Sequence, residues 1–305
     1  MLCLQKQLKV TNKTMRSINF EVTEKFNDKP LLHFLKSEVK MSSRLIKTLK
    51  RVENGMQCNG EHIRTIDKVK TGDKITINMP DVEILVDTTD ENLDVVYEDD
   101  DILIVNKPPT MPIHETRNNQ GNTLMNAVLG YLSTKGKPTS FRAIGRLDRG
   151  TSGLVLCALN PYIAASLSGE IEKTYLAIAS KKFEENGTIN APIYRPAPPK
   201  THRCVDQRGD RAVTHYEVIS SGENFSLLKI NLETGRTHQI RVHFAHLDSP
   251  LYGDDMYGEK SGKLSHQALH CFEMNFTHPV SKQIIQVQGE MPKDMKKLLD
   301  ELKCD

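Results

Sequence analysis

Hydrophobic residues near the start of the chain predict a small module of two helices and short strands. Two segments carry apolar residues at helical spacing: Leu31, Leu32 and Leu35 in the first, and Leu45, Ile46 and Leu49 in the second. Ser42 and Ser43 are available to cap the second helix. Turns that contain glycine follow, and segment 74–77 alternates polar and apolar residues as a strand does.

The rest of the chain mixes buried strands with helices. The continuous aliphatic runs at 102–106 and 154–159 predict strands that are buried on both faces. Between these two runs, Asn122 or Thr123 can cap a helix that carries Leu124, Val128 and Leu132. Further strands are predicted at 175–179, 212–219 and 226–231, and further helices after Asn160, after Gly235 and after Pro292. Because the order lacks a strict βαβ rhythm, the pattern favours an α+β fold, with a mixed, largely antiparallel sheet, flanking helices and a small N-terminal α/β domain.

Composition narrows the class of protein. The chain has 305 residues, of which 38% are hydrophobic and 26% charged, as expected for about two globular domains. No apolar run approaches the ~18 residues of a membrane helix, and the first twenty residues lack the apolar stretch of a secretion signal. The six cysteines are scattered, which argues against a disulfide framework and against a four-cysteine zinc site. We therefore expect a reduced, cytoplasmic protein with no membrane partner.

The net charge of +2 conceals two segments of opposite sign. Residues 1–80 carry 16 Lys and Arg against 8 Asp and Glu, whereas residues 81–101 carry ten acidic residues and no basic one. A basic module favours a polyanion, although a solvated lysine-rich face explains its charge equally well. The expected division is an N-terminal extension (1–28), a basic module (29–80), an acidic linker (81–94) and a larger domain (95–305).

Basic side chains on the second predicted helix favour RNA as the polyanion. The face opposite its leucines carries Arg44, Lys47, Lys50 and Arg51. Segments 56–60 and 69–75 resemble the closing phrase of the alpha-L RNA-binding motif, which also combines two short helices with small strands. The resemblance implies that the 29–80 module binds RNA and that these four side chains contact it.

A glycine-rich loop, residues 145–153, carries the most unusual chemistry of the chain. It places Asp148 between Arg146 and Arg149, immediately before a buried strand. In a loop of this kind, an aspartate most often caps a nearby backbone amide. Guanidinium groups beside it would instead keep the carboxylate ionised and oriented, and such a group can act as a nucleophile or a base.

Residues 234–243 contain further arginines that could pair with an acidic side chain. If Thr237 caps the helix there, Arg241 lies just over one turn into it, beside the apolar face of Ile240, Phe244 and Leu247. A partly buried arginine needs an anionic partner, and Asp148 is the candidate. The alternatives are a surface arginine and a phosphate clamp.

The tripeptide 173–175 ends in Tyr175 at the start of a predicted strand. A tyrosine ring is a flat, amphipathic platform on which a base can stack. A half-buried strand tyrosine is an equally good interpretation of this segment alone.

Taken in order, these motifs resemble the RluA-type pseudouridine synthase family. The matches are 146–153, 173–175 and 235–241, preceded by 104–109 with His114 and followed by Leu269-His270 and His278-Pro279. The resemblance covers roughly Tyr97 to Pro292, and a basic front module is a familiar attachment in this family. One residue departs from the pattern: the family usually has a histidine where this chain has Gly145.

The resemblance implies an RNA pseudouridine synthase, an isomerase that detaches uracil from ribose, turns it and rejoins it through carbon. A base stacked in RNA has to be flipped out before it can react. Asp148 would attack the anomeric carbon, add to the pyrimidine ring, or remove the ribose proton beside the anomeric carbon. The resemblance also implies stacking and proton transfer for Tyr175, and pairing with Asp148 for Arg241 or Arg236. Arg146 would fill the vacated stack, Arg236 would contact a phosphate, and Lys107 would lie at the RNA cleft. Leu269 would form an apolar wall of the base pocket or would simply pack in the core.

The same resemblance implies no cofactor and no metal, because the bonds are rearranged within one nucleotide. The chain has neither a P-loop nor a dinucleotide fingerprint. His238, His243 and His246 could suggest a zinc site, but His238 does not share the helix face of the other two. Packing or RNA contact is the better interpretation of these histidines. We expect a monomer whose partner is RNA, with ribosomal RNA favoured over transfer RNA.

Two other functions compete with this interpretation. A non-catalytic RNA-binding protein could have the same fold, although it would not need an isolated carboxylate facing a polyanion. A glycoside hydrolase would need paired carboxylates, and the core motifs supply only Asp148.

Overall fold

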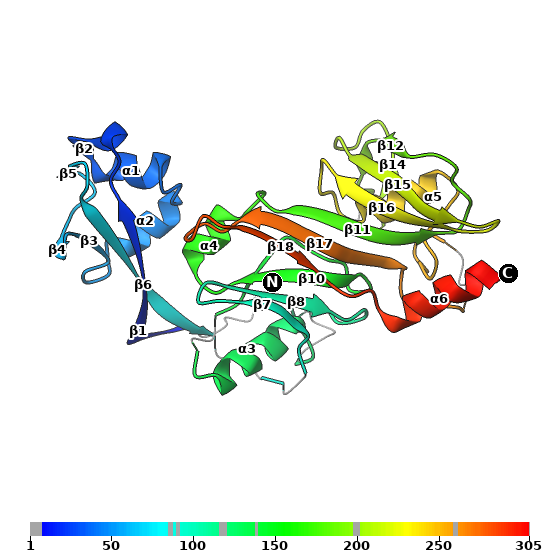
Figure 1. The fold of residues 1–305 in the computed structure, drawn as a ribbon, viewed down its shortest axis with the longest axis horizontal. Coiled ribbons are helices and arrows are strands. Elements are labelled where there is room, and N and C mark those ends of the chain that lie inside the picture. The colour runs from blue at the N-terminus through cyan, green and yellow to red at the C-terminus, as the bar shows by residue number, and fades with distance from the viewer. Residues whose placement is uncertain are drawn as a thin grey trace.

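The computed structural model describes residues 8–84, 88–89, 92–115, 121–137, 140–197, 202–258 and 262–304, with side chains at all of these except 8–14 and 81–84. It consists of a small N-terminal module and a larger body, which lie side by side in Figure 1. Helices and strands are mixed, and the main sheet is largely antiparallel, so the predicted α+β class is confirmed.

The module is built on a four-stranded sheet with the order β1-β6-β3-β4. Its elements are β1 (Leu8–Glu21), a 3-10 helix (Glu24–Phe26), β2 (Lys29–Pro30), α1 (Leu31–Ser37), α2 (Ser43–Leu49), β3 (Met56–Cys58), β4 (Glu61–His62), β5 (Lys68–Val69) and β6 (Lys74–Ile84). The side chain of Ser42 accepts a hydrogen bond from the amide of Leu45 and so caps α2. Leu31, Leu35 and Leu49 are buried, as their spacing predicted, whereas Leu32 is exposed.

The expected boundaries of the module need correction at both ends. Strand β1 lies within 1–28, yet it pairs with β6 over most of its length and is therefore part of the module rather than an extension ahead of it. Strand β6 also continues to Ile84, inside the segment expected as a linker. All three acidic positions at 87–91, Asp87, Asp90 and Glu91, lie outside the described residues.

An ion pair and an aromatic contact dock the module on the body. Arg16 on β1 donates two hydrogen bonds to the buried carboxylate of Asp101, at 2.8 and 2.6 Å. Phe20, also on β1, meets Tyr162 of the body edge to face, with 5.6 Å between the ring centres. The module is thus held against the body by β1 itself.

The body contains a ten-stranded sheet among the described residues, ordered β12-β15-β16-β11-β17-β10-β8-β7, with β18 on β17 and β9 on β10. Its elements are β7 (Val95–Glu98), β8 (Ile102–Lys107), α3 (Leu124–Thr134), β9 (Arg142–Ile144), β10 (Ser152–Ala158), α4 (Pro161–Ser166), β11 (Glu172–Ala179), β12 (Gly187–Asn190), β13 (Ile193–Tyr194), β14 (Cys204–Val205), β15 (Val213–Ser221), β16 (Ser226–Leu232), α5 (Gln239–His246), β17 (Leu269–Thr277), β18 (Ile284–Gln288) and α6 (Lys293–Cys304).

Helices cover the sheet where its strands are most apolar. Helix α3, capped by Thr123, packs on the β8 side chains Leu103 and Val105. Helix α6 packs its leucines against Ile178 of β11. Across the described ranges, every helix is too short or too polar to cross a lipid bilayer.

One close strand contact sets the geometry of the site. Strands β10 and β17 run parallel, with Gly153 opposite Cys271. Gly153 has a φ of +108°, and a Cβ there would lie only 2.3 Å from the carbonyl oxygen of Cys271. Only glycine can occupy this position without displacing β17, so the loop before β10 is brought against the start of β17.

Candidate active site

Asp148 lies in the loop that leads into β10, and the surrounding residues fix that loop. The amide of Thr151 donates to the carbonyl of Asp148 at 3.0 Å, which closes a turn. The side chain of Gln267, just before β17, donates to the hydroxyl of Thr151 at 2.9 Å. Ser152 contacts the buried ring of His270 at 2.9 Å. Both sides of the β10–β17 contact therefore hold the loop that carries Asp148.

Arg241 on α5 binds Asp148, as the sequence analysis predicted. Its Nη1 donates to Oδ2 of Asp148 at 3.1 Å. Its Nε and Nη2 donate to the fully buried Asp254, both at 2.7 Å. Burial tends to lower the pKa of Arg241, but the two aspartates raise it on balance. A guanidinium fixed by Asp254 is thus presented to Asp148, whose side chain stays 24% exposed.

Helix α5 begins differently from the prediction. Thr237 is not the cap; His238 takes that position, in the left-handed conformation with a φ of 59° and without a capping hydrogen bond. The side chain of Gln239 accepts from the amide of Arg236 instead and anchors the helix start to β15. Arg241 therefore lies within the first turn. Leu247, expected on the buried face, is exposed because the helix ends at His246.

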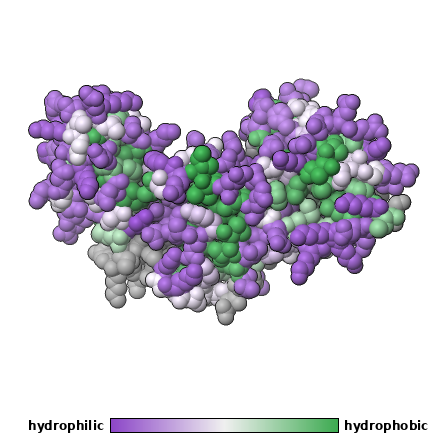
Figure 2. All heavy atoms as spheres, in the orientation of Figure 1, coloured by the Kyte–Doolittle hydropathy of each residue, from purple (hydrophilic) through white to green (hydrophobic). Residues whose placement is uncertain are grey.

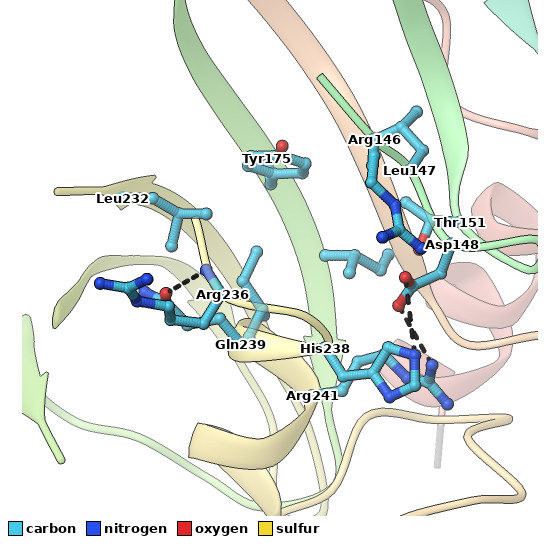
Figure 3. Close-up of a pocket in the computed structure, with 12 residues that line it drawn as sticks. Arg146, Leu147, Asp148, Thr151, Tyr175, Leu232, Arg236, His238, Gln239 and Arg241 are labelled. Atoms are coloured by element: carbon cyan, nitrogen blue, oxygen red, sulfur yellow. Dashed lines mark hydrogen bonds and ion pairs between the residues drawn. The ribbon is translucent and has the colours of Figure 1, made fainter. Parts of the chain in front are cut away.

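Tyr175 and Leu269 come from neighbouring strands, β11 and β17, and line the same pocket as Asp148 (Figure 3). Both are largely buried. Burial raises the pKa of the Tyr175 phenol well above its ordinary value, and nearby Cys271 and Asp148 raise it further. The phenol is therefore neutral at physiological pH. The remaining lining residues are Arg146, Leu147, Thr151, Leu232, Arg236, His238, Gln239, Ile240 and Arg241.

Arg146 and Arg236 lie at the rim of this pocket. Arg146 is exposed and makes no hydrogen bond or ion pair with the described part of the chain. Arg236 donates to the carbonyl of Arg211 and lies 3.6 Å from the carboxylate of Asp210. Arg241, not Arg236, contacts Asp148, which decides between the two alternatives for that pair.

Lys107 does not border an RNA cleft. It is only 1% exposed, and its ammonium donates to the carbonyls of Pro108 at 2.9 Å and Arg149 at 3.3 Å. Burial lowers its pKa to about 7, although the charge of Asp148 partly opposes this. The predicted place at a cleft is therefore wrong: Lys107 lies beneath the Asp148 loop, because the strand that carries it is buried on both faces.

Gly145, the departure from the family pattern, also has a structural explanation. Its φ is +79°, and an added Cβ would lie 2.8 Å from the ammonium of Lys173. The end of the lysine side chain thus occupies space that a larger residue would need.

The sequence did not identify three residues of the site. Asp254 anchors Arg241, His238 lies 3.7 Å from Oδ1 of Asp148, and Tyr257 binds His238 at 2.8 Å. No spacing signal points to Asp254 or Tyr257, since both come from a loop beyond α5. His238 belongs to a recognised motif, but the sequence suggested only packing or RNA contact for it.

The predicted RNA-contact residues Arg44, Lys47, Lys50 and Arg51 are all solvent exposed. Helix α2 ends at Leu49, so only Arg44 and Lys47 lie on it, and Lys50 and Arg51 follow directly. Helices α2 and α5 lie at opposite ends of the molecule, as Figure 1 shows. In Figure 2, hydrophilic residues cover much of both ends, and hydrophobic patches lie between them. The basic helix and the Asp148 pocket are therefore separate features.

Metal ligands do not gather in the pocket as far as the described residues show. Within them, the potential three-residue site is Asp99, Asp101 and His278, where the module meets the body. Its carboxylates already bind Arg16, Asn160 and Tyr97. His243 uses both ring nitrogens, on Thr214 and on the carbonyl of Ala191.

Comparison with known proteins places the chain among RNA-modifying enzymes. A family model described as RNA pseudouridylate synthase matches residues 101–246. The uncharacterised RNA pseudouridine synthase YhcT of Bacillus subtilis is 36% identical over 296 residues, covering 94% of this chain and 98% of the relative. Ribosomal large subunit pseudouridine synthase D of Salmonella typhimurium is 35% identical and covers 83% of this chain and 82% of its own. The solved human RNA pseudouridylate synthase domain containing 1 is 25% identical, with a TM-score of 0.55, covering 72% of this chain and 98% of its own.

Proposed function

The chain belongs to the RNA pseudouridine synthase family, of the RluA type, and from that premise we propose that it isomerises uridines in ribosomal RNA with Asp148 as its catalytic residue. The observation that supports the proposal is the unequal binding of the two carboxylate oxygens of Asp148. Oδ2 is bound by Arg241, whereas Oδ1 accepts no hydrogen bond from the described residues, and the Asp148 side chain lines the same pocket as Tyr175 and Leu269.

Each chemical role open to Asp148 uses this arrangement. Attack on the anomeric carbon, addition to the pyrimidine ring and removal of the ribose proton all need an unprotonated carboxylate with an open oxygen. The permanent cation of Arg241 compensates the negative charge of Asp148 beside a polyanionic substrate. Its bidentate bond to Asp254 keeps that cation in place.

Tyr175 and Leu269 supply the surfaces on which an extruded uracil would rest. A neutral phenol offers a flat face for stacking and an O–H group for proton transfer. Leu269 is the apolar wall of the pocket. Both come from the central strands of the sheet, which hold them more rigidly than a loop would.

Arg146 and Arg236 serve the RNA rather than the base. Arg146, exposed and unpaired within the described ranges, fills the stack that the flipped uridine leaves. Arg236, at the rim beside Arg211, contacts a phosphate. The basic face of α2 binds a second stretch of the same RNA, and the enzyme acts as a monomer without a cofactor or metal.

Ribosomal RNA is favoured because curated relatives at about 35% identity are named ribosomal large subunit pseudouridine synthases. Two features of the molecule fit a large structured substrate: the basic helix is far from the pocket, and the module is docked rather than loose. Mapping pseudouridines in ribosomal and transfer RNA from cells with and without the gene tests this choice. Loss of sites only from transfer RNA contradicts it.

The chemistry is tested by tritium release from RNA that carries 5-tritiated uridine. We expect release by the wild type and none by Asp148→Asn, which keeps the size of the side chain but removes its charge. The matched control is Asp100→Asn, because Asp100 is 77% exposed and lies at the module contact. RNA binding without release by the wild type would favour the non-catalytic alternative.

The role of α2 is tested by replacing Arg44, Lys47, Lys50 and Arg51 with glutamine together. We expect weaker RNA affinity and a shallower salt dependence of binding, because fewer counterions are released. The matched control replaces four exposed lysines of α6, at 293, 296, 297 and 303. Equal effects of both sets would mean that α2 is an ordinary charged surface.

A further inference from the structure

His238 occupies an unusual place beside the catalytic carboxylate. Its backbone has a φ of 59°, a conformation that non-glycine residues rarely adopt and that marks functional sites. Its side chain is 15% exposed, and its Nε2 lies 3.7 Å from Oδ1 of Asp148. Figure 3 shows His238 and Arg241 reaching the two oxygens of Asp148 from the same side. The proposed chemistry so far gives His238 no task.

Tyr257 determines which nitrogen of His238 carries the proton. The Tyr257 hydroxyl accepts from the backbone amide of Arg203 at 2.9 Å and lies 2.8 Å from Nδ1 of His238. Among the described residues, Nδ1 is the acceptor within reach of the phenolic O–H. Tyr257 therefore donates to Nδ1, and neutral His238 carries its proton on Nε2, the nitrogen that faces Asp148.

The charges around His238 favour this neutral form. Burial lowers its pKa, and the cations of Arg241 and Arg203 act in the same direction. Asp148 and Asp254 oppose them only in part. The ring thus presents an N–H group, not a lone pair, to the carboxylate, which argues against His238 as a general base.

We propose that His238 is a positioning residue, whose Nε2–H binds Oδ1 of Asp148 once RNA is bound, so that Arg241 and His238 hold one carboxylate oxygen each. The inference rests on the proposed function, because it assigns Asp148 the catalytic role. The distance of 3.7 Å is too long for a hydrogen bond in the free enzyme. Such contacts are often long without substrate and tighten in the complex, and an approach of under about 1 Å by the side chain of Asp148 closes this one.

The movement falls to the side chain of Asp148, because its loop and its two partners are fixed. Arg241 is held by two hydrogen bonds to buried Asp254, and His238 is held through Tyr257. Asp148 has only the single contact to Arg241 and a partly exposed side chain. A carboxylate oxygen that accepts one hydrogen bond keeps a further lone pair, so the bond to His238 orients Asp148 without blocking it.

A pair of substitutions that differ by one methylene tests the proposal. His238→Gln places an amide N–H near the former Nε2, whereas His238→Asn, which tolerates the left-handed backbone, reaches only the former Nδ1. In tritium-release kinetics we expect His238→Asn to lose on the order of 100-fold in kcat with little change in KM. His238→Gln should stay within about 5-fold of the wild type, since it keeps the donor.

Tyr257→Phe provides a readout that a merely structural role would not move. Without the phenol, neutral His238 can place its proton on either nitrogen, and kcat falls by a few fold. Protonation restores the Nε2–H in every molecule, so the deficit of Tyr257→Phe relative to the wild type should narrow as the pH falls from 8 to 5.5. A deficit that stays constant with pH contradicts the proposal, as does equal activity of His238→Asn and His238→Gln.

A measurement on the intact enzyme separates this inference from the proposed function. Nitrogen-15 NMR of labelled histidines should show the Nε2–H tautomer for the signal that disappears in His238→Gln, and a mixture in Tyr257→Phe. Finding the Nδ1–H tautomer overturns the inference even if Asp148→Asn proves the chemistry. Tritium release that persists in Asp148→Asn overturns the proposed function instead. His246→Gln, an exposed histidine of the same helix, is the control with wild-type kinetics.

Discussion

In the described part of the chain, an arginine joins two aspartates both at the Asp148 pocket and at the module contact, and the two places differ in the freedom of the second carboxylate. In both, one aspartate is buried and held bidentately: Asp254 by Arg241, and Asp101 by Arg16. At the module contact, the second aspartate, Asp100, is 3.9 Å away and largely in water. At the pocket, the second aspartate is Asp148, in direct contact at 3.1 Å and facing the cavity.

The difference separates the buried aspartates, which anchor an arginine, from Asp148, which keeps an oxygen free. A bidentate pair engages both oxygens of the buried aspartate and leaves neither of them free for further chemistry. The single bond to Asp148 supplies positive charge and direction but leaves Oδ1 open. The same residue types thus dock a domain in one region and prepare a carboxylate in the other, and the predictions that follow test this contrast.

The largest effect is expected when Asp254, the aspartate that anchors Arg241, is removed. Asp254→Ala leaves Arg241 buried with only Asp148 as a partner, so we expect a loss of stability of about 3 kcal/mol. Turnover should fall on the order of 100-fold, because Arg241 can then swing onto Asp148. Denaturant unfolding and tritium release measure the two effects. The neighbouring, exposed Asp255→Ala is the control, and an equal response of both variants would remove Asp254 from its anchoring role.

The corresponding anchor of the module should affect stability but not chemistry. Asp101→Ala removes charge-assisted hydrogen bonds from Arg16 and Asn160, and we expect a loss of about 2 kcal/mol. Turnover on a short, unstructured RNA should stay at the wild-type level. A fall in that turnover as large as the one in Asp254→Ala would mean that the two clusters are not separate in function. Asp100→Ala serves as the exposed control.

Lys107 makes the stability of the pocket region depend on pH. Its pKa is lowered by burial to about 7, against an ordinary value of 10.5, so between these values the unfolded chain binds a proton that the folded protein lacks. Stability should therefore rise with pH in that window, by up to about 1.4 kcal/mol per unit from this residue. We expect Lys107→Met to have a shallower rise between pH 7.5 and 9.5 in denaturant midpoints. If the stability of the two proteins rose with pH in parallel, Lys107 would not have the lowered pKa that burial gives it.

The smallest effect is expected from Arg16→Lys. A lysine keeps the charge but cannot form the bidentate contact with Asp101, so we expect a loss of about 1 kcal/mol. The matched control is Arg64→Lys, because Arg64 also binds an aspartate, Asp67, bidentately but on the surface. Its unfolding midpoint should not change, since exposed ion pairs contribute little. Equal shifts in both variants would mean that the Arg16 pair is an ordinary surface contact.

Local features of the chain were predictable because their causes are local. The caps at Ser42, Thr123 and Asn160 form as expected, since each side chain bonds an amide only three residues away. The buried strands 102–106 and 154–159 follow from uninterrupted aliphatic runs. The cap of α5 was mispredicted because Gln239 bonds to β15, which lies far away in the sequence.

What the sequence determined by itself was the family and the candidate site residues: the Asp148 loop, Tyr175, Arg241 and Leu269 stand in motifs that can be recognised without coordinates, and they line one pocket. What only the tertiary structure decided was how those groups are held. Asp254 and Tyr257 reach the site from a loop after α5, β1 joins a module from which it seemed separate, and Lys107 lies beneath the loop rather than at the surface. Contacts between distant segments leave no periodic trace in a sequence, because they depend on strand order and burial, which the chain specifies only when it folds.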